Sequence, residues 1–217
     1  MAKKKVGDNT KKIHLYDFDG TICEGDTTFK LYLFFLRKNP LIILWLPYQL
    51  LFLILRTFSL VSDTRVKEIF LVFLWNQYKV EKKIKEFSDN RQKYLFPKVL
   101  DKIKKDKDSG ATLICISASP RLYIEEMCKG LGFDYIIATE TKEGSYRKLA
   151  SKNCRGPEKV IRLKQLLKDE GLEEAEIVSM ISDSKFDKPL YDLAKEKYMV
   201  DEKGNITKGI PERVFNF

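Results

Sequence analysis

The chain has 217 residues, of which 44% are hydrophobic, and it carries a formal net charge of +9. This length suits one medium domain or a core domain with an insert, and the apolar content excludes wholesale disorder. The basic excess favours an anionic partner, but the chain has no zinc-finger, RNA-binding-sheet or basic-zipper motif, so nucleic acid is not an expected partner.

The first predicted element is a strand over residues 12–18 (KIHLYDF), which contains Asp17 and is followed at once by Asp19. Residues i and i+2 of a strand point the same way, so both carboxylates can face one substrate. Asp19 and Gly20 could equally form an ordinary turn. The single histidine, His14, is expected to be structural, which leaves proton transfer to a carboxylate.

Residues 27–108 interrupt the strand pattern and are predicted to form a helical insert. The expected helical segments are 27–38, 40–58, 62–77 and a charged stretch over 79–108. In the charged stretch acids and bases are interleaved, which is typical of a solvated helix face. Asp26 precedes the first segment and is expected to be its N-cap.

The second half of the chain alternates between strands and helices. The predicted elements, in order, are a strand over 111–117, a helix over 119–132, a strand over 134–139, a helix over 156–171 and a strand over 176–182. Ser119 is expected to cap the first helix with Pro120 at its first position, and Pro157 and Gly171 mark the ends of the second. The near-continuous apolar strands predict an open α/β fold with a mainly parallel sheet.

The four cysteines are widely spaced and include no CxxC pair. This pattern indicates reduced thiols in a reducing compartment rather than a disulfide framework or a zinc site. The basic amino terminus runs directly into an apolar strand and has no signal-peptide core, so export is not expected. We therefore expect a cytoplasmic protein.

Polar residues follow three of the predicted strands, at the edge of the sheet where ligands bind in such folds. These residues are Asp17, Asp19, Ser117, Asp183 and Asp187, with Lys159 in the first turn of the second helix. Each has an ordinary alternative role as a turn residue, a cap neighbour or a surface lysine. Together they offer a carboxylate nucleophile, a carboxylate acid and base, and groups that can hold phosphoryl oxygens. Clustered acids near a phosphate need a cation, and hard oxygen ligands favour Mg2+.

Four short motifs strengthen this interpretation. DFDGT (17–21), the serine that ends ICIS (Ser117), the lysine of GPEKV (Lys159) and SDSKFD resemble, in order, the motifs of the haloacid dehalogenase superfamily of phosphatases. The chain resembles the phosphoserine-phosphatase-like branch of that superfamily. The resemblance implies a Rossmann-like core over residues 1–26 and 109–217 and a helical cap over 27–108.

The resemblance also implies roles for individual residues. Asp17 would attack phosphorus and form an aspartyl-phosphate, and Asp19 would protonate the leaving oxygen and then activate water. Ser117 and Lys159 would hold the phosphoryl group. Mg2+ would be held by the Asp17 side chain, the Asp19 backbone carbonyl and Asp183, with Asp187 supporting from nearby. The acid at position 19 separates phosphatases from the related ion-pumping ATPases, which carry a threonine there.

The cap contains an apolar segment, residues 41–61, in which nearly every residue from Leu41 to Leu55 is aliphatic or Trp. Two interpretations are open: a helix buried against its neighbours, or a surface that enters a bilayer. Fifteen helical residues span only ~22 Å, less than the ~30 Å hydrocarbon thickness. A single crossing would also place Asp17 and Asp183 on opposite sides, so the segment is expected to be either buried in protein or inserted from one side. The cations available for anionic headgroups are Arg37, Lys38, Arg56 and Arg65.

This combination is similar to the bacterial phosphatidylglycerophosphatase C family. The matching stretches are DFDGT, the Pro-containing apolar segment, ISASP, CRGPEKV and SDSKFDKPL. The similarity implies a peripheral enzyme at the inner face of the cytoplasmic membrane that dephosphorylates phosphatidylglycerophosphate or a related phospholipid headgroup. The alternatives are a soluble phosphatase of small metabolites and a membrane-docking module without catalysis. Amino-acid phosphatases carry a glutamate nine residues after the nucleophile, whereas this chain has Asp26 there.

Overall fold

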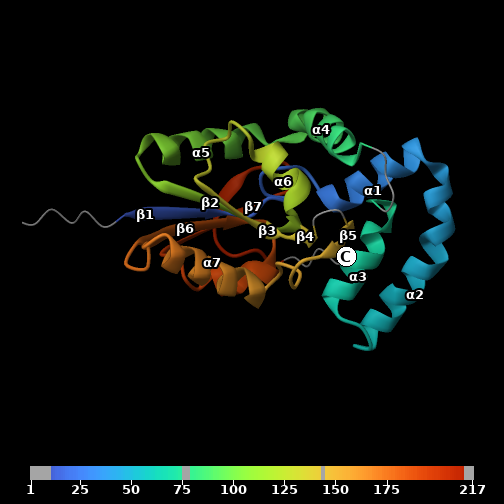
Figure 1. Cartoon of the computed structure of the whole chain (residues 1–217). Helices are drawn as coiled ribbons and strands as arrows, with labels where there is room; N and C mark the ends of the chain where they lie inside the picture. Colours follow the sequence, from blue (N-terminus) through green and yellow to red (C-terminus); the bar gives the residue numbers. More distant parts are fainter. Residues whose placement is uncertain (1–10, 75–78, 143–144, 213–217) are drawn as a thin grey trace, which may run out of the picture.

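The computed structural model describes residues 11–74, 79–142 and 145–212 (Figure 1). Within these residues, six strands form one sheet in the order β3-β2-β1-β6-β7-β8. The strands are β1 (Lys12–Tyr16), β2 (Thr112–Pro120), β3 (Tyr135–Thr139), β6 (Glu176–Ser182), β7 (Glu196–Val200) and β8 (Ile206–Lys208). Only β8 is antiparallel to its neighbour. The predicted α/β fold with a mainly parallel sheet is confirmed.

Helices cover both faces of the sheet (Figure 1). One face packs against α4 (Val80–Arg91), α5 (Pro97–Asp108) and α6 (Arg121–Cys128), and the other against α7 (Pro157–Asp169) and α8 (Lys188–Tyr191). Successive residues of β1 alternate between the two cores: Leu15 packs on the α7 side and Tyr16 on the α5 side. Because both faces of the central strands are covered, most residues of β1, β2 and β6 are apolar.

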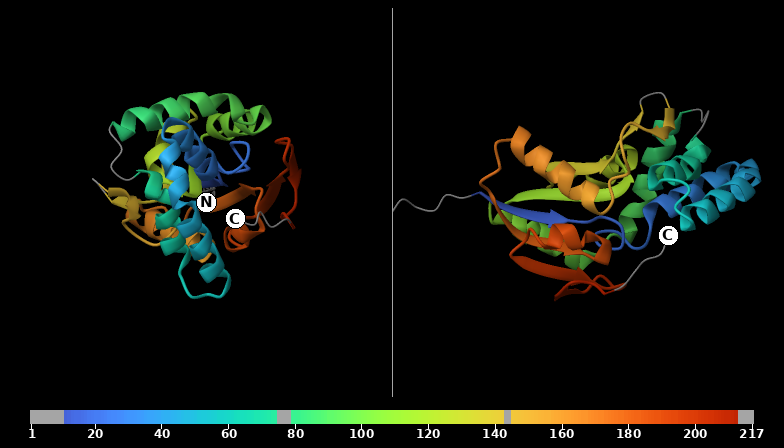
Figure 2. Two further views of the ribbon diagram at one scale, coloured as in Figure 1. Left: turned by 90° about the vertical axis from the view of Figure 1, so that its right-hand side faces the viewer. Right: turned by 90° about the horizontal axis from the view of Figure 1, so that it is seen from below.

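The segment between β1 and β2 is helical. It contains α1 (Thr27–Lys38), η1 (Pro40–Trp45), α2 (Leu46–Thr57), α3 (Asp63–Phe70), η2 (Leu71–Leu74), α4, η3 (Gln92–Tyr94) and α5. Helices α1 to α3 extend beyond the carboxyl ends of the strands, whereas α5 lies along the sheet (Figures 1 and 2). Asp26 caps α1 as predicted, because its carboxylate accepts a hydrogen bond from the Phe29 N–H at 2.8 Å. Residues 75–77 of the predicted third segment lie outside the described residues.

Two predicted boundaries can be compared with the structure. Helix α7 begins at Pro157 and ends just before Gly171, whose φ is +63°, so this prediction is confirmed. The prediction that Ser119 caps a helix is wrong. Strand β2 continues through Pro120, α6 begins at Arg121, and the Ser119 hydroxyl binds Asp19 instead.

Several short elements were not predicted. They are the last two strands of the sheet, β7 and β8, a hairpin formed by β4 (Thr141–Lys142) and β5 (Ser145–Leu149), and the turn η4 (Lys185–Asp187). All four cysteines are free and buried, as expected for reduced thiols. His14 contacts Ser179 at 2.7 Å and Asp106 at 3.2 Å, below the carboxyl end of β1, which fits its expected structural role.

The apolar segment, residues 41–61, lies on the outside of the molecule. Figure 1 shows α2 at the outer edge, on the side away from the sheet. Leu44 is 73% exposed and Ile54 is 55% exposed, and only 11% of the stretch Pro40–Thr57 is buried. The buried residue of α2 is polar: the Gln49 carboxamide accepts from the Tyr32 hydroxyl at 3.1 Å. Burial of the segment as a core helix is therefore not observed.

Candidate active site

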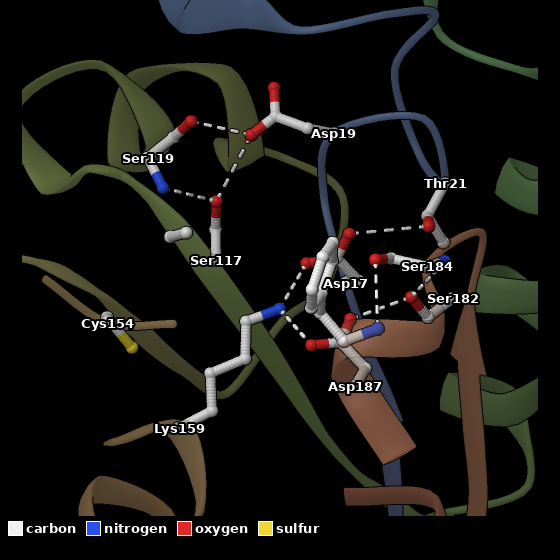
Figure 3. A network of polar contacts seen from close by, with 12 residues as sticks. Asp17, Asp19, Thr21, Ser117, Ser119, Cys154, Lys159, Ser182, Ser184 and Asp187 are labelled. Carbon is white, nitrogen blue, oxygen red and sulfur yellow. Dashed lines mark hydrogen bonds and ion pairs between the residues drawn. The ribbon is translucent and has the colours of Figure 1, made fainter. Parts of the chain in front are cut away.

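The first carboxylate of DFDGT is fixed at the end of β1. The Asp17 N–H donates to the Ile181 carbonyl at 2.9 Å, so Asp17 continues the ladder between β1 and β6. Its side chain is buried, and Oδ1 accepts a hydrogen bond from Lys159 Nζ at 2.7 Å (Figure 3). Burial raises the pKa of Asp17 well above its usual range, and the attraction of Lys159 only partly opposes this.

Lys159 joins two carboxylates. It lies in the first turn of α7, is 3% exposed, and places Nζ 2.7 Å from an oxygen of Asp17 and 2.7 Å from an oxygen of Asp187. Burial alone would lower the pKa of this ammonium, but the charges of Asp17 and Asp187 outweigh it and raise the pKa. The Ser182 hydroxyl binds the other oxygen of Asp187 at 2.7 Å. The cluster thus holds a charged lysine between two buried acids.

Asp183 follows β6 and is held by the loop after β1. The Thr21 hydroxyl donates to Asp183 Oδ1 at 3.1 Å and accepts from the Asp183 N–H at 2.9 Å. Gly20 has φ +70°, and a Cβ there would lie 2.1 Å from Asp183 Oδ2. Only glycine therefore lets the two loops approach this closely. Burial raises the pKa of Asp183 to about 7.

Asp19 contacts a different set of groups. Its Oδ1 accepts from the Thr27 N–H at 2.7 Å and the Thr27 hydroxyl at 2.5 Å, and its Oδ2 accepts from the Ser119 hydroxyl at 2.6 Å. Ser117 is the more distant partner, at 3.4 Å. Figure 3 shows Asp19 turned toward Ser117 and Ser119, while Asp17 faces Lys159. Burial, followed by repulsion from Asp26, raises the pKa of Asp19.

The oxygens at this edge of the sheet suit a hard divalent cation. Among the described residues, no set of three or more His, Cys, Asp or Glu side chains encloses a metal. Mg2+ does not need such a cage, because it keeps several waters and binds one or two carboxylates. The cluster holds three carboxylates, those of Asp17, Asp183 and Asp187, against the single ammonium of Lys159, so a bound cation would offset charge that Lys159 alone does not. The carboxylates of Asp17 and Asp183, which both contact the Thr21 hydroxyl, therefore fit the cation expected from the sequence.

All six predicted site residues lie at the carboxyl end of the sheet, but the sequence reasoning missed several of their partners. Thr21 and Ser119 lie within the motifs DFDGT and ISASP, so the sequence could have indicated them as site residues. Lys67 of α3 was not signalled by any motif. Its Nζ lies 3.4 Å from the Thr28 hydroxyl, and burial lowers its pKa while the charges of Asp26 and Asp19 oppose this.

Comparison with known proteins adds three findings. Residues 15–192 match the family model described as haloacid dehalogenase-like hydrolase. No curated protein matches the chain. Among solved structures, the chain is similar to a protein of unknown function from Bordetella pertussis Tohama I, with 21% identity, 87% of this chain and 89% of that chain covered, and a TM-score of 0.73.

Two further solved structures carry a descriptive name. One is a phosphoserine phosphohydrolase-like protein from Francisella tularensis subsp. tularensis SCHU S4, with 21% identity, 86% and 85% of the two chains covered, and a TM-score of 0.59. The other is a substrate-bound phosphoserine phosphatase, with 16% identity, 88% and 87% covered, and a TM-score of 0.62. At these identities the likeness establishes the shared fold.

Proposed function

The chain belongs to the haloacid dehalogenase-like hydrolase family, and from this premise we propose that it is a Mg2+-dependent phosphomonoesterase that works through an aspartyl-phosphate. The observation that carries the proposal is the cluster of Asp17, Lys159, Asp187 and Asp183 at the end of the sheet, with Asp19 beside it. A buried ammonium among acids can receive a phosphoryl group there, since it offsets the charge that would otherwise repel it.

Asp17 is the nucleophile in this proposal. Lys159 binds Oδ1, so Oδ2 is the oxygen available for in-line attack, with the Thr21 hydroxyl 3.5 Å from it. The new bond joins Asp17 to phosphorus, and the bond between phosphorus and the ester oxygen breaks. Mg2+, when bound, would neutralise the phosphoryl oxygens and the carboxylates around them. Ser117 and Lys159 would hold the remaining phosphoryl oxygens.

Asp19 supplies the proton transfers. It would give a proton to the departing ester oxygen and then take one from the water that hydrolyses the aspartyl-phosphate. The four donors around its carboxylate fix its position beside Asp17. With His14 occupied elsewhere by Ser179 and Asp106, a carboxylate is the acid and base at this site.

We also propose that the phosphate ester is a phospholipid headgroup, with phosphatidylglycerophosphate favoured, and that the enzyme docks on the inner face of the cytoplasmic membrane. The exposed apolar segment supports this. Its side chains exposed by about half or more include Leu41, Leu44, Leu51, Ile54, Phe58 and Leu60. An exposed apolar surface of this kind is typical of a membrane or protein contact, and each side chain that leaves water contributes on the order of 1–2 kcal/mol.

The connection of the segment to the sheet supports docking from one side. By length and composition, Pro40–Thr57 is apolar enough to cross a membrane. The helical insert leaves from β1 and returns to β2, and these are adjacent parallel strands. A single crossing would place Asp17 and Asp183 on opposite sides of the membrane, whereas the side chains of both residues contact the Thr21 hydroxyl. Insertion of one face from the cytoplasmic side keeps the site intact.

Three of the cations that flank the apolar segment form ion pairs in the structure. Lys38 binds Glu86 at 2.8 Å, Arg56 binds Asp63, and Arg65 binds Glu68 at 3.1 Å. The Lys38–Glu86 and Arg56–Asp63 pairs are solvent-exposed, and pairs of this kind typically contribute about 0–1 kcal/mol, whereas Glu68 is half-buried. Anionic headgroups can therefore compete for the same cations at little cost.

The test of the reaction is phosphate release with and without Mg2+. Phosphatidylglycerophosphate in mixed micelles would be compared with phosphoserine and a panel of sugar and nucleotide phosphates, with Asp17→Asn as the blank. Preference for the lipid supports the full proposal. Preference for a soluble ester would favour the alternative, a soluble small-metabolite phosphatase. Absence of Mg2+-dependent release from every ester would favour a docking module without catalysis.

A second test separates docking from chemistry. Leu44→Glu and Leu51→Glu change exposed positions in and beside α2, so the fold should tolerate them. Ile161→Glu is the matched control. Ile161 is also exposed, at 60%, but it lies on α7, which covers one face of the sheet and is not part of the apolar segment. We expect the first two variants, and not the control, to lose flotation with anionic vesicles. A wild-type protein that does not float would overturn membrane docking.

A further inference from the structure

The Asp19 carboxylate is held by hydroxyl groups that the proposed reaction does not consume. Thr27 donates to Oδ1 from both its N–H and its hydroxyl, and Ser119 donates to Oδ2. These two residues come from opposite sides of the site: Thr27 begins α1, and Ser119 lies near the end of β2. The position of Asp19 thus depends on two hydroxyls from elements far apart in sequence.

A second layer of hydroxyls joins these two. The Tyr123 hydroxyl, from α6, lies 3.0 Å from the Thr27 hydroxyl and 2.9 Å from the Thr28 hydroxyl. The Thr28 hydroxyl in turn lies 2.9 Å from the Ser119 hydroxyl. The contacts therefore close into a ring that runs from Asp19 through Thr27, Tyr123, Thr28 and Ser119 and back to Asp19. We call this the hydroxyl ring.

The hydrogens in the hydroxyl ring have a defined direction. Each hydroxyl carries one hydrogen, and those of Thr27 and Ser119 are used on the Asp19 carboxylate. The Ser119 oxygen can then accept from Thr28, and the Thr28 oxygen from Tyr123, while the Thr27 hydroxyl lies within donor reach of both Asp19 and the Tyr123 oxygen. Burial, followed by the charge of Asp19, holds the pKa of Tyr123 well above its usual range, so the phenol keeps that hydrogen. Bonds that all point toward one acceptor strengthen one another.

The hydroxyl ring also reaches the cap. Lys67 Nζ of α3 lies 3.4 Å from the Thr28 hydroxyl. Neighbouring residues of α3 contact the core: Thr64 accepts from the Asn153 N–H and Glu68 accepts from the Leu149 N–H, each at 3.1 Å. The Lys67 ammonium adds a hydrogen-bond donor at Thr28, a member of the ring that does not itself contact Asp19. The ring is thus attached to both the sheet and α3.

We propose that Tyr123 is a positioning residue, whose hydroxyl fixes Thr27 and Thr28 and through them aims the Asp19 carboxylate at the leaving-group oxygen. This inference rests on the proposed function. Tyr123 is fully buried, and its ring packs edge-on against Phe87 with centroids 5.8 Å apart. The side chain is thereby immobilised, and its hydroxyl is a fixed point. Without it the Thr28 hydroxyl loses its donor and the Thr27 hydroxyl loses one of its two acceptors, so the Asp19 carboxylate is held less firmly.

The test is Tyr123→Phe, which removes the hydroxyl and keeps the ring contact. Tyr32→Phe is the matched control, since Tyr32 is also buried but its hydroxyl binds Gln49 within the cap. Steady-state rates would be measured on p-nitrophenyl phosphate, whose leaving group needs no proton, and on an alkyl phosphate, whose leaving group does. We expect Tyr123→Phe to lower kcat/KM, which reports on the step that releases the ester leaving group, about 10- to 100-fold on the alkyl ester and less on the aryl ester. Tyr32→Phe should match wild type on both.

A second variant keeps the test decisive if Tyr123→Phe unfolds. Thr28→Val interrupts the hydroxyl ring at the next position, and we expect the same preferential loss on the alkyl ester. Combined with Tyr123→Phe it should add little, because both changes break one network. Equal losses of kcat/KM on the two esters, or unchanged kcat/KM in both variants, would overturn the inference while an active wild type preserved the proposed function. A wild type that releases no phosphate from any ester overturns both.

Discussion

Asp183 is expected to destabilise the metal-free protein at neutral and alkaline pH. Its side chain is 8% exposed, and burial raises its pKa from 3.8 to about 7. Because the pKa in the folded state lies above that in the unfolded state, the carboxyl stabilises the fold fully only below about pH 4. That contribution is lost as the pH rises through 7. The informative change is Asp183→Asn, which is neutral at every pH.

The magnitude follows from the two pKa values. The gap between 3.8 and about 7 corresponds to a penalty of roughly 4 kcal/mol at pH 8 and roughly 2 kcal/mol at pH 5. An asparagine oxygen can still accept from the Thr21 hydroxyl, and the N–H at position 183 is unchanged. We therefore expect Asp183→Asn to raise the free energy of unfolding by up to about 4 kcal/mol at pH 8 and by about half of that at pH 5.

The assay is urea unfolding in EDTA at pH 5 and pH 8, for wild type, Asp183→Asn and Asp101→Asn. Asp101 lies on the exposed side of α5, so its variant controls for the loss of one negative charge. Mg2+ would then be added at pH 8. A ligand that binds only the folded state stabilises it by mass action, so wild type should gain stability and Asp183→Asn should gain little.

Two results would refute this reasoning. If Asp183→Asn were no more stable than wild type at pH 8, or if its gain were equal at pH 5 and pH 8, burial would not be raising the pKa of Asp183. If Mg2+ stabilised both proteins equally, Asp183 would not belong to the metal site. If Asp183→Asn were more stable but less active than wild type, the charge of Asp183 would lower the stability of the fold while being required for activity.

Three further changes test neighbouring contacts. Asp17→Asn should abolish phosphate release with the fold intact by circular dichroism; a tenth of wild-type activity would exclude Asp17 as the nucleophile. Lys159→Met should lower the free energy of unfolding by about 3–5 kcal/mol at pH 8, because Asp17 and Asp187 lose their counter-charge. Protonation should reduce that loss at pH 5, and equal losses in urea melts at both pH values would contradict the argument. Gly20→Ala places a Cβ 2.1 Å from Asp183 at a φ of +70°, so we expect about 1–3 kcal/mol of destabilisation and lost activity; a wild-type melting temperature would count against it.

The meeting of the six candidate residues at one edge could be predicted because it follows from topology. Parallel strands end at one edge, so residues at the carboxyl ends of β1, β2 and β6 lie close together there, although Asp17 and Lys159 are 142 positions apart. The local sequence pattern also predicted α7, because Pro157 marks its start and Gly171 follows its end. Strand ends and helix starts are features of a few consecutive residues, so one sequence suffices to locate them.

The contacts of Asp19 could not be predicted in the same way. The hydroxyl ring uses two threonines, a serine and a tyrosine, which are common residue types with no shared spacing. Ser119 was assigned to a helix cap because Ser-Pro usually begins a helix. Its hydroxyl has a stronger acceptor in the Asp19 carboxylate at 2.6 Å, and β2 continues to Pro120 to deliver it there. Tertiary contact thus overrides the local preference.

The apolar segment shows the limit of composition most clearly. A buried helix and a helix at a bilayer surface can have the same length and the same apolar content, so the sequence left both open. The structure distinguishes them by which residue faces inward. In α2 the buried residue is Gln49, which binds Tyr32 and the Ile69 carbonyl, while Leu51 and Ile54 face outward. A helix solvated by water on its outer face has the opposite pattern. The outer face of α2 is therefore built for an apolar neighbour, which is the property that the proposed docking on a membrane requires.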